Sequence, residues 1–359
     1  MNIVIIGNNS NGMYLFRRQL IAALIEEGNP ITIFTPFDTD VDRLKALGAN
    51  LIDTPMERRG TNPLQDVILL QRYAKELKRI KPDLVVTYTI KPNVYGGLVC
   101  RLLQIPYAEN ITGLGTAFDT DGILKRIAKS LYRIALKKAV IVFFENSTNR
   151  DFFVDENIVD RRKTYVLPGA GVDLDHFSFC AYPQNEEFRF LFIGRIMKEK
   201  GIDELLAVVK RLLKEGAPCS LDVLGQYEED YKERLEEAQK EGWLRYHGSQ
   251  PDVRPFIAAS DCFVLPSYHE GMANTNLECA ASGRPIITSN IPGCKEAVID
   301  GVSGYTCEPK DVESLYGMMK KILETPREER IRMGIAGRKH MEEAFDKNAV
   351  VKETIRHLF

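Results

Sequence analysis

Short apolar runs alternate with longer helical patterns along most of the chain. In the first half these runs are continuous and rich in Val, Ile, Tyr and Phe, which is typical of strands buried on both faces. Helical spacing of apolar positions separates them, for example over residues 13–27 and 64–79. Such an order predicts a parallel sheet covered by helices on both sides. The expected strands are residues 2–6, 30–34, 84–88, 107–110 and 140–144.

The pattern restarts after residue 160. A second set of strands is expected at residues 187–193, 220–224, 245–246, 262–264 and 285–288, again with helices between them. Two successive runs of this kind predict two doubly wound α/β domains. The segment Pro168-Gly169-Ala170-Gly171 breaks the periodicity and marks the seam. We therefore expect a first domain over 1–167, a second over 168–345, and a terminal helix over 346–359.

Two details are expected at the C-terminal end. Thr325 and Asp346 are positioned to cap the last two helices. The terminal helix is expected to return to the first domain, with four apolar side chains packed there. These are Val350, Val351, Ile355 and Leu358.

Composition places the chain among globular proteins. Its 359 residues are 44% hydrophobic and 27% charged, and no apolar run approaches the length of a membrane span. The N-terminus opens on an apolar strand, so we expect no signal peptide and a cytoplasmic location. The seven cysteines are scattered without a C-x-x-C pair, so neither a zinc site nor a disulfide framework is expected.

The net charge of −2 is unevenly distributed. Residues 1–165 carry 23 Lys and Arg against 18 Asp and Glu, and the remainder carries 25 against 32. A basic first half indicates a domain that meets something anionic. Chance distribution over two solvated surfaces is the alternative.

The most informative segment is LPSYHEGMANTNLECA at residues 265–280. It follows an apolar strand, passes through a loop containing Gly271, and enters a helix whose free N-terminal amides favour an anion. Glu270 and Glu278 flank that helix start, and carboxylates accept hydrogen bonds from paired hydroxyls. The segment therefore indicates a ligand with phosphate in its middle and sugars on either side. Glu278 as a surface acid and Gly271 as a plain turn are the alternatives.

A second segment, FLFIGRIMKEKG at residues 190–201, also ends a buried strand in glycine. Arg195 and Lys200 follow Gly194 where the strand opens into the crevice, and two cations there suit a diphosphate. A solvated basic loop is the alternative.

Together these segments resemble the retaining family-four glycosyltransferases of the GT-B architecture, over nearly the whole chain. The E-x₇-E pair is Glu270 and Glu278, and the phosphate-binding pair is Arg195 and Lys200. The resemblance implies that Glu278 holds ribose hydroxyls and Glu270 the transferred sugar. It implies that Glu270, Arg195 and Lys200 are the catalytic residues. The remaining donor-binding positions that it implies are Gly194, Gly225, His247, Gly248, Gly271, Met272, Ala273, Asn274 and Thr275.

The first half resembles bacterial enzymes that extend undecaprenyl-diphosphate-linked oligosaccharides, including N-acetylgalactosaminyltransferases and capsule-type transferases. The segments TYTIKPNVYG at 87–96 and NITGLG at 110–115 carry this resemblance. One departure concerns the histidine that many family-four enzymes have near the transferred sugar, because Asn110 or Thr112 stands there. The expected acceptor-side residues are Asn11, Gly12, Arg59, Asn62, Lys91, Asn110, Thr112 and Gly113.

The resemblance implies a retaining transferase that moves a hexose or N-acetylhexosamine from a UDP-sugar to a lipid-diphosphate-linked saccharide. Neither a metal nor another cofactor is expected, nor a nucleic-acid partner. A sugar-nucleotide epimerase of the same fold and a non-catalytic sugar-binding module are the alternatives. A nicotinamide dehydrogenase is disfavoured because Gly7 and Gly12 do not have the G-x-G-x-x-G spacing.

Residues 123–138 predict a basic amphipathic helix. Its expected apolar stripe is Leu124, Ile127, Leu131, Ile134 and Ala135, and it carries six cations and no acid: Lys125, Arg126, Lys129, Arg133, Lys137 and Lys138. Such a helix can lie on an anionic leaflet, here the inner face of the cytoplasmic membrane. An ordinary helix with its stripe on the core is the alternative.

Overall fold

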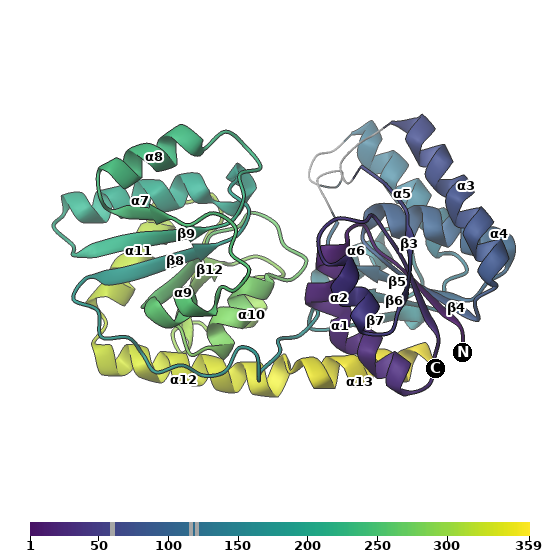
Figure 1. The fold of residues 1–359 in the computed structure, drawn as a ribbon. Coiled ribbons are helices and arrows are strands. Elements are labelled where there is room, and N and C mark those ends of the chain that lie inside the picture. Colours follow the sequence, from purple (N-terminus) through teal and green to yellow (C-terminus); the bar gives the residue numbers. More distant parts are fainter. Residues whose placement is uncertain (58–61, 115–117, 119–121) are drawn as a thin grey trace. The chain divides into compact units, whose positions relative to one another are not determined.

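The computed structural model describes residues 1–57, 62–114, 118 and 122–359, apart from the side chain of Leu124. The chain forms two compact units, one of residues 1–170 with 348–359 and the other of residues 171–347. These boundaries lie within three residues of those expected from the sequence. Each unit contains a parallel sheet (Figure 1).

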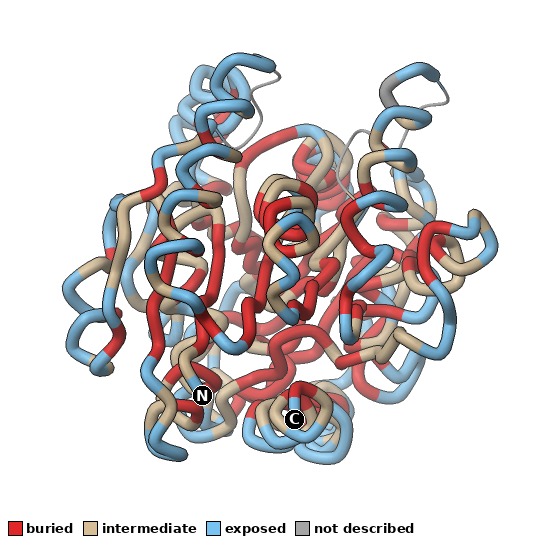
Figure 2. The backbone as a smooth tube through the Cα atoms, turned by 90° about the vertical axis from the view of Figure 1, so that its right-hand side faces the viewer, coloured by how far each residue is buried: buried red, intermediate tan, exposed pale blue. Residues whose placement is uncertain are grey.

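Unit 1 has a seven-stranded sheet in the order β3-β2-β1-β4-β5-β6-β7. Strands β1, β2, β4, β5 and β6 contain buried Val, Ile or Phe, so burial concentrates in the middle of the sheet (Figure 2). The strands are β1 (Ile3–Ile6), β2 (Ile31–Thr35), β3 (Asn50–Asp53), β4 (Leu84–Tyr88), β5 (Tyr107–Ile111), β6 (Ile141–Phe144) and β7 (Thr164–Val166).

Helices cover both faces of this sheet because its buried side chains alternate between two clusters. The cluster containing Val4 and Ile6 packs against α3 (Pro63–Ile80), α4 (Gly97–Leu103), α5 (Ile123–Leu136) and α6 (Ser147–Asp155). The cluster containing Ile3 and Ile5 packs against α1 (Ser10–Glu26), α2 (Val41–Ala46) and α13 (Lys347–Leu358). A single π-helical turn, η1 (Pro92–Gly96), leads into α4, and a 3-10 turn, η3 (Arg161–Lys163), precedes β7.

Helix α13 belongs to unit 1 although it ends the chain. Val350 and Leu358 are buried in the cluster of Ile3 and Ile5, and Val351 and Ile355 pack against it. These are the four residues expected from the sequence to make this contact. The Tyr165 hydroxyl also donates to Glu353 Oε2 at 3.0 Å.

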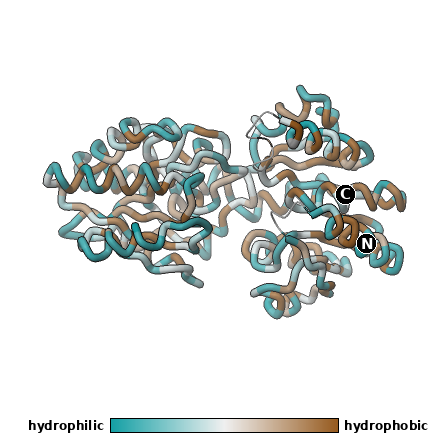
Figure 3. The backbone as a smooth tube through the Cα atoms, turned by 90° about the horizontal axis from the view of Figure 1, so that it is seen from above, coloured by the Kyte–Doolittle hydropathy of each residue, from teal (hydrophilic) through white to brown (hydrophobic). Residues whose placement is uncertain are grey.

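Unit 2 has a six-stranded sheet in the order β10-β9-β8-β11-β12-β13. Its hydrophobic strands are enclosed by more polar helices (Figure 3). The strands are β8 (Phe188–Ile193), β9 (Cys219–Leu224), β10 (Leu244–Tyr246), β11 (Cys262–Leu265), β12 (Ile286–Ser289) and β13 (Gly304–Cys307). The helices are α7 (Ile202–Lys214), α8 (Lys232–Lys240), α9 (Arg254–Ala259), α10 (Asn274–Ala281), α11 (Val312–Glu324) and α12 (Arg327–Ala344), with 3-10 turns η4 (Lys198–Lys200) and η5 (Lys295–Ala297).

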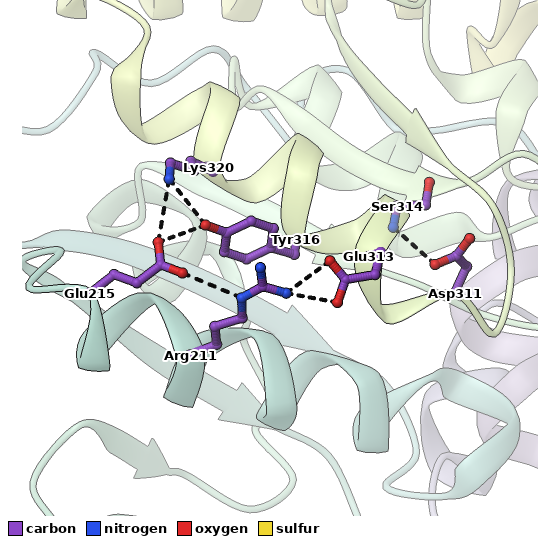
Figure 4. Close-up of polar contacts among 7 residues, drawn as sticks. All are labelled: Arg211, Glu215, Asp311, Glu313, Ser314, Tyr316 and Lys320. Carbon is purple, nitrogen blue, oxygen red and sulfur yellow. Dashed lines mark hydrogen bonds and ion pairs between the residues drawn. The ribbon is translucent and has the colours of Figure 1, made fainter.

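A surface network joins α7 to α11 in unit 2 (Figure 4). The Arg211 guanidinium lies 3.7 Å from the centre of the Tyr316 ring and donates to Glu313 Oε1 at 2.7 Å. Tyr316 in turn donates to Glu215 Oε2 at 2.6 Å. The network links the two helices. Its charged groups are largely open to solvent, so it adds little to the stability of unit 2.

The helix caps near the C-terminus correct one expectation. Thr325 ends α11 instead of starting α12, and its hydroxyl donates to the Lys321 carbonyl oxygen at 2.7 Å. Pro326 takes the N-cap position of α12 and offers no side-chain acceptor. Asp346 immediately precedes α13, as expected.

Helix α5 also differs in part from its expected pattern. Ala135 is fully buried and Leu131 packs against the core, so these two face inward. Ile127 and Ile134, which were expected on the same stripe, are 50% and 45% exposed. Leu124 lies outside the described side chains. The buried stripe is completed by Tyr132 and Leu136.

Candidate donor site in unit 2

The site begins at the point where the strand order of unit 2 reverses. β8 pairs with β9 on one side and with β11 on the other. In doubly wound sheets, ligands bind at the carboxyl ends of the strands beside such a reversal. The loops that leave β8 and β11 here carry the two segments singled out in the sequence.

These two loops are joined to each other by their backbones. The Tyr268 amide donates to the Glu199 carbonyl oxygen at 2.8 Å, and the Tyr268 hydroxyl donates to Glu204 Oε1 at 2.6 Å. Gly201 has a φ of +71°, and a Cβ atom there would lie 2.1 Å from the Pro266 carbonyl oxygen. Only glycine permits this approach, so the loops are held together as one frame.

The frame brings Lys200 and Glu270 into direct contact. Lys200 Nζ is paired with Glu270 Oε1, and the two side chains are 14% and 13% exposed. The Ser267 hydroxyl donates to the same Glu270 oxygen at 2.8 Å. A cation expected at the phosphate and a carboxylate expected at the sugar therefore neutralise each other.

Arg195 lies on the same loop but is more open. Its side chain is 42% exposed, and its Nη1 atom is 3.6 Å from Glu228 Oε2. An exposed guanidinium of this kind can turn toward an incoming anion at little cost.

The N-terminus of α10 offers backbone amides beside this pair. Its N-cap residue is Ala273, which has no side-chain oxygen to accept from the first turn. The Ala273 amide itself donates to the Gly293 carbonyl oxygen at 2.7 Å. Asn274 has a buried Oδ1 atom without a hydrogen-bond partner among the described residues. Because no side chain caps this helix start, the positive end of the helix dipole is available to an anion.

The two acids stand on either side of this helix start. Glu270 precedes it in the loop and Glu278 follows on the second turn of α10, half-buried. Gly271 and Met272 connect Glu270 to the helix, and Thr275 lies in its first turn. A Cβ atom on Gly293 would lie 2.5 Å from the Gly271 carbonyl oxygen. The loop after β12, which contains Gly293, therefore packs closely against the backbone that precedes α10.

Three glycines line the carboxyl ends of the neighbouring strands β8, β9 and β10. The Gly225 amide donates to the Gly248 carbonyl oxygen at 2.9 Å. A Cβ atom on Gly225 would lie 1.8 Å from the Gly194 carbonyl oxygen. The structure thus brings Gly194, Gly225 and Gly248 together at the ends of three adjacent strands, where all three are half-buried.

The His247 side chain is hydrogen-bonded within the fold. Its Nε2 atom is 2.7 Å from Asp222 Oδ1, and Arg245 binds the same carboxylate. Burial alone would raise the pKa of Asp222, but the hydrogen bonds from Arg245 and His247 outweigh it and hold that pKa below its usual value. The Nε2 atom of His247 is thus held by Asp222.

In unit 1, the expected acceptor residues lie at the carboxyl ends of β1, β4 and β5. Asn11 and Gly12 follow β1, Lys91 follows β4, and Asn110, Thr112 and Gly113 lie at the end of β5. Asn62 caps α3 by accepting from the Leu64 amide at 3.1 Å. Arg59 lies outside the described residues.

Several of these groups are already committed to the fold. Lys91 Nζ is paired with Asp66 Oδ1 at 2.8 Å, and the two side chains are largely buried. Asn110 is buried and donates to the Thr87 carbonyl oxygen at 3.2 Å. Asn11 donates to Asp40 Oδ2 at 2.7 Å.

The first helix of unit 1 differs from α10 in a way that matters for anions. The amides of Ser10 and Asn11 at the start of α1 donate to Asp38 Oδ1, at 3.1 and 3.2 Å. A carboxylate of the protein thus fills the position where a dinucleotide phosphate binds in a Rossmann domain. This argues against the dehydrogenase alternative.

Three residues that hold the site were not assigned roles from the sequence. Ser267 contacts Glu270, Tyr268 joins the two loops, and Asn276 donates to Thr288 Oγ1 at 3.0 Å beneath α10. Ser267 and Tyr268 stood inside the informative segment, within three residues of Glu270. Only their burial and partners distinguish them from ordinary loop residues.

Comparison with known proteins agrees with this geometry. Residues 3–146 match the family model "Glycosyl transferase 4-like", and residues 181–340 match "Glycosyl transferases group 1". The crystal structure of Anabaena Alr3699/HepE in complex with UDP and glucose superimposes with a TM-score of 0.81, at 15% identity, covering 100% of this chain and 99% of that one. The expected fold, two doubly wound domains of GT-B type, is confirmed.

Two curated relatives extend the comparison. The N,N'-diacetylbacillosaminyl-diphospho-undecaprenol alpha-1,3-N-acetylgalactosaminyltransferase of Campylobacter jejuni is 27% identical, over 94% of this chain and 92% of its own. The lipopolysaccharide core biosynthesis glycosyltransferase LpsE of Rhizobium meliloti is 30% identical, over 72% of this chain and 71% of its own length. The chain therefore belongs to the glycosyltransferases, with a glycosyl transferase 4-like unit followed by a glycosyl transferases group 1 unit.

Proposed function

We propose that this glycosyltransferase moves a hexose or N-acetylhexosamine from a UDP-sugar to a lipid-diphosphate-linked saccharide, with retention of configuration. The observation that carries the proposal is the uncapped start of α10 in unit 2, with Lys200 and Arg195 beside it and an acid on either side. The name of the Campylobacter jejuni relative, which transfers N-acetylgalactosamine to an undecaprenol-diphosphate-linked sugar, supports the acceptor class.

The donor diphosphate would lie against the cations and the helix start. Lys200, Arg195 and the amides of Asn274 and Thr275 neutralise charge that grows as the nucleoside diphosphate departs. Losing one such donor of electrostatic stabilisation typically costs about 2.7–4 kcal/mol. In this mechanism, activity persists in EDTA, because protein cations replace a metal at the leaving group.

Retention follows from attack on the face that the leaving group departs from. The bond between the anomeric carbon and the phosphate oxygen breaks, and a bond from that carbon to the acceptor hydroxyl oxygen forms on the same side. The hydroxyl proton passes to the leaving phosphate. No protein nucleophile takes part, and Glu270 stays with the hydroxyls of the sugar.

The two acids divide the donor between them. Glu278 holds the ribose hydroxyls, and the backbone around Gly225, His247 and Gly248 lies along the nucleotide. These backbone groups meet at the ends of three adjacent strands. Glu270 binds the transferred sugar. Because UDP lacks that sugar, this contact distinguishes a UDP-sugar from UDP.

The acceptor side is assigned to the carboxyl edge of the unit 1 sheet, where Asn11, Lys91 and Asn110 lie. The excess of Lys and Arg in residues 1–165 suits a diphosphate-linked acceptor.

A panel of UDP-sugars tests the proposal directly. UDP release is measured with and without a short polyprenyl-diphosphate-linked saccharide, in buffer containing EDTA. We expect release that requires both the acceptor and one UDP-sugar, and a product with the donor's anomeric configuration. Conversion of the UDP-sugar to its epimer without acceptor would favour an epimerase instead, and strict dependence on Mg²⁺ or Mn²⁺ would contradict the cationic leaving-group site.

We further propose that unit 1 docks on an anionic leaflet, at the cytoplasmic face of the membrane. The outer side of α5 exposes Ile123, Ile127 and Ile134. Arg126, and Lys137 and Lys138 just after the helix, are exposed as well. Apolar side chains flanked by cations suit lipid tails below phosphate headgroups, with about 1 kcal/mol per cation near the surface.

A second exposed apolar group lies at the start of α3, at Leu64, Val67 and Ile68. In parallel sheets the covering helices begin at the carboxyl ends of the strands, so the starts of α3 and α5 lie at the same edge. That edge is the one assigned to the acceptor, and α3, α4 and α5 cover the same face of the sheet (Figure 1). Within the described residues, no helix is both long and apolar enough to cross a membrane.

Liposome flotation tests the docking. We expect binding to require anionic lipid and to fall with salt. Replacing Arg126, Lys137 and Lys138 with Glu abolishes it, while the same change at three exposed lysines of unit 2, Lys214, Lys232 and Lys240, does not. Equal binding by the two triple variants would contradict the assigned surface, and a protein that stays soluble at low salt would contradict docking altogether.

A further inference from the structure

Ser267 holds the Glu270 carboxylate from a position closed to solvent. The residue is fully buried, and its hydroxyl donates to Glu270 Oε1 at 2.8 Å. A hydrogen bond to a charged acceptor is stronger than one between neutral groups. Because Ser267 is buried, any influence on a ligand passes through Glu270.

The same Glu270 oxygen is also paired with Lys200. A donor diphosphate with two negative charges competes with Glu270 for that lysine. Once Lys200 turns to the diphosphate, the carboxylate loses its cation. The Ser267 hydroxyl then remains to keep Glu270 in one orientation.

The hydroxyl is itself held by a rigid frame. Pro266 on one side packs against Gly201, and Tyr268 on the other is hydrogen-bonded to Glu199 and Glu204. A donor on such a frame loses little conformational freedom when it keeps its bond.

We propose that Ser267 is a positioning residue, which keeps Glu270 directed at the transferred sugar when the donor diphosphate takes Lys200. The proposal rests on the function assigned to Glu270 above. It concerns discrimination between UDP-sugar and UDP, because only the UDP-sugar carries the hydroxyls that Glu270 binds.

The test compares the affinities of the parent and of Ser267→Ala for UDP and for the UDP-sugar that supports turnover in the panel, by calorimetry without acceptor. We expect UDP affinity to be unchanged and UDP-sugar affinity to fall on the order of tenfold, as for the loss of one hydrogen bond to a charged group. Ser267→Thr keeps the hydroxyl and restores UDP-sugar binding. Ser260→Ala removes a buried hydroxyl of the same unit that donates to the Ile257 carbonyl oxygen, and is the matched control.

A double-mutant cycle separates positioning from a merely structural effect. In the Glu270→Ala background, Ser267→Ala is expected to change UDP-sugar affinity no further. An equal loss in both backgrounds, or UDP-sugar affinity that is unchanged by Ser267→Ala alone, would overturn the proposal. If Glu270→Ala itself leaves UDP-sugar affinity unchanged, the sugar-binding role of Glu270 falls as well, so the two failures are distinguishable.

Discussion

Single residues fix the geometry of the donor site through backbone strain and burial. Gly201 is the clearest case, because it combines a left-handed φ of +71° with a carbonyl oxygen 2.1 Å from the position of a Cβ atom. A side chain there must push apart the loops that carry Lys200 and Glu270. The geometry of the site thus requires glycine at position 201 as well as the charged side chains.

We therefore expect Gly201→Ala to weaken UDP binding and to lower the melting temperature. Gly216→Ala is a matched control, since it has a φ of +85° with nothing within 4 Å of a Cβ atom. The control variant is destabilised only by the strain of placing alanine in a left-handed conformation, about 1–2 kcal/mol. Calorimetry with UDP and thermal unfolding check the pair, and equal behaviour of the two variants would show that the loop contact is unimportant.

Glu109 in unit 1 is a residue-scale feature of another kind. It is fully buried on β5, and both carboxylate oxygens lack a hydrogen-bond partner among the described residues. Burial raises the pKa of Glu109 well above its usual value, so the folded chain keeps it protonated. Above the unfolded pKa of about 4.5 the unfolded chain loses this proton while the folded chain retains it, so stability falls as pH rises.

The expected loss is about 1.4 kcal/mol per pH unit between the unfolded and the folded pKa. Glu109→Gln removes this dependence, so its stability relative to the parent improves from pH 5 upward. Urea unfolding across pH measures the difference, with exposed Glu26→Gln as control. A constant difference between parent and Glu109→Gln would mean that Glu109 ionises in the folded chain.

At the residue scale, the sequence was most informative where charge and glycine coincide. Arg195, Lys200, Glu270 and Glu278 were singled out from their types, their spacing and the family resemblance, and their roles stay predictions. The Lys200–Glu270 contact was not recognisable from the sequence, because it joins two loops 70 residues apart. The same holds for Ser267, whose burial decides its role.

At the scale of elements, the hydrophobic pattern predicted the central strands and missed strands at or near the sheet edges. β3 and β7 are half-exposed and have no continuous apolar run, and β13 begins with a glycine. β3 and β7 have no fully buried residue, so the signal of full burial is absent there, whereas β13 is largely buried and its apolar run is interrupted by Gly304. Helix α5 shows the same limit, because its pattern could not tell an inward from an outward apolar stripe.

Helix α13 is the element whose packing was predicted most closely. We expect Leu358→Ala to destabilise unit 1 by about 2 kcal/mol, the lower end for a buried leucine, since the side chain keeps 8% of its surface exposed. Lys352→Ala, on the exposed side of the same helix, is the control and should be near neutral. Chemical unfolding followed by circular dichroism checks both, and an unaffected Leu358→Ala would remove α13 from the core of unit 1.

For the whole molecule, the two units use the same topology in different ways. In unit 1 the start of α1 is already occupied by Asp38, whereas the start of α10 in unit 2 has no capping side chain at Ala273. Two doubly wound domains were predictable from the repeated strand–helix pattern. The difference between the helix starts of α1 and α10 was not predictable, because Asp38 contacts α1 from the loop after β2.

The most direct test of the donor site is a titration of UDP into the parent, Glu278→Ala and Glu270→Ala. Glu278 is assigned to the ribose, which UDP contains, and Glu270 to the sugar, which UDP lacks. We expect Glu278→Ala to weaken UDP binding on the order of tenfold or more, as for the loss of charged hydrogen bonds. Glu270→Ala is expected to bind UDP at least as well as the parent while its turnover collapses. UDP binding that is unchanged in both variants would contradict the placement of the nucleotide-sugar in unit 2.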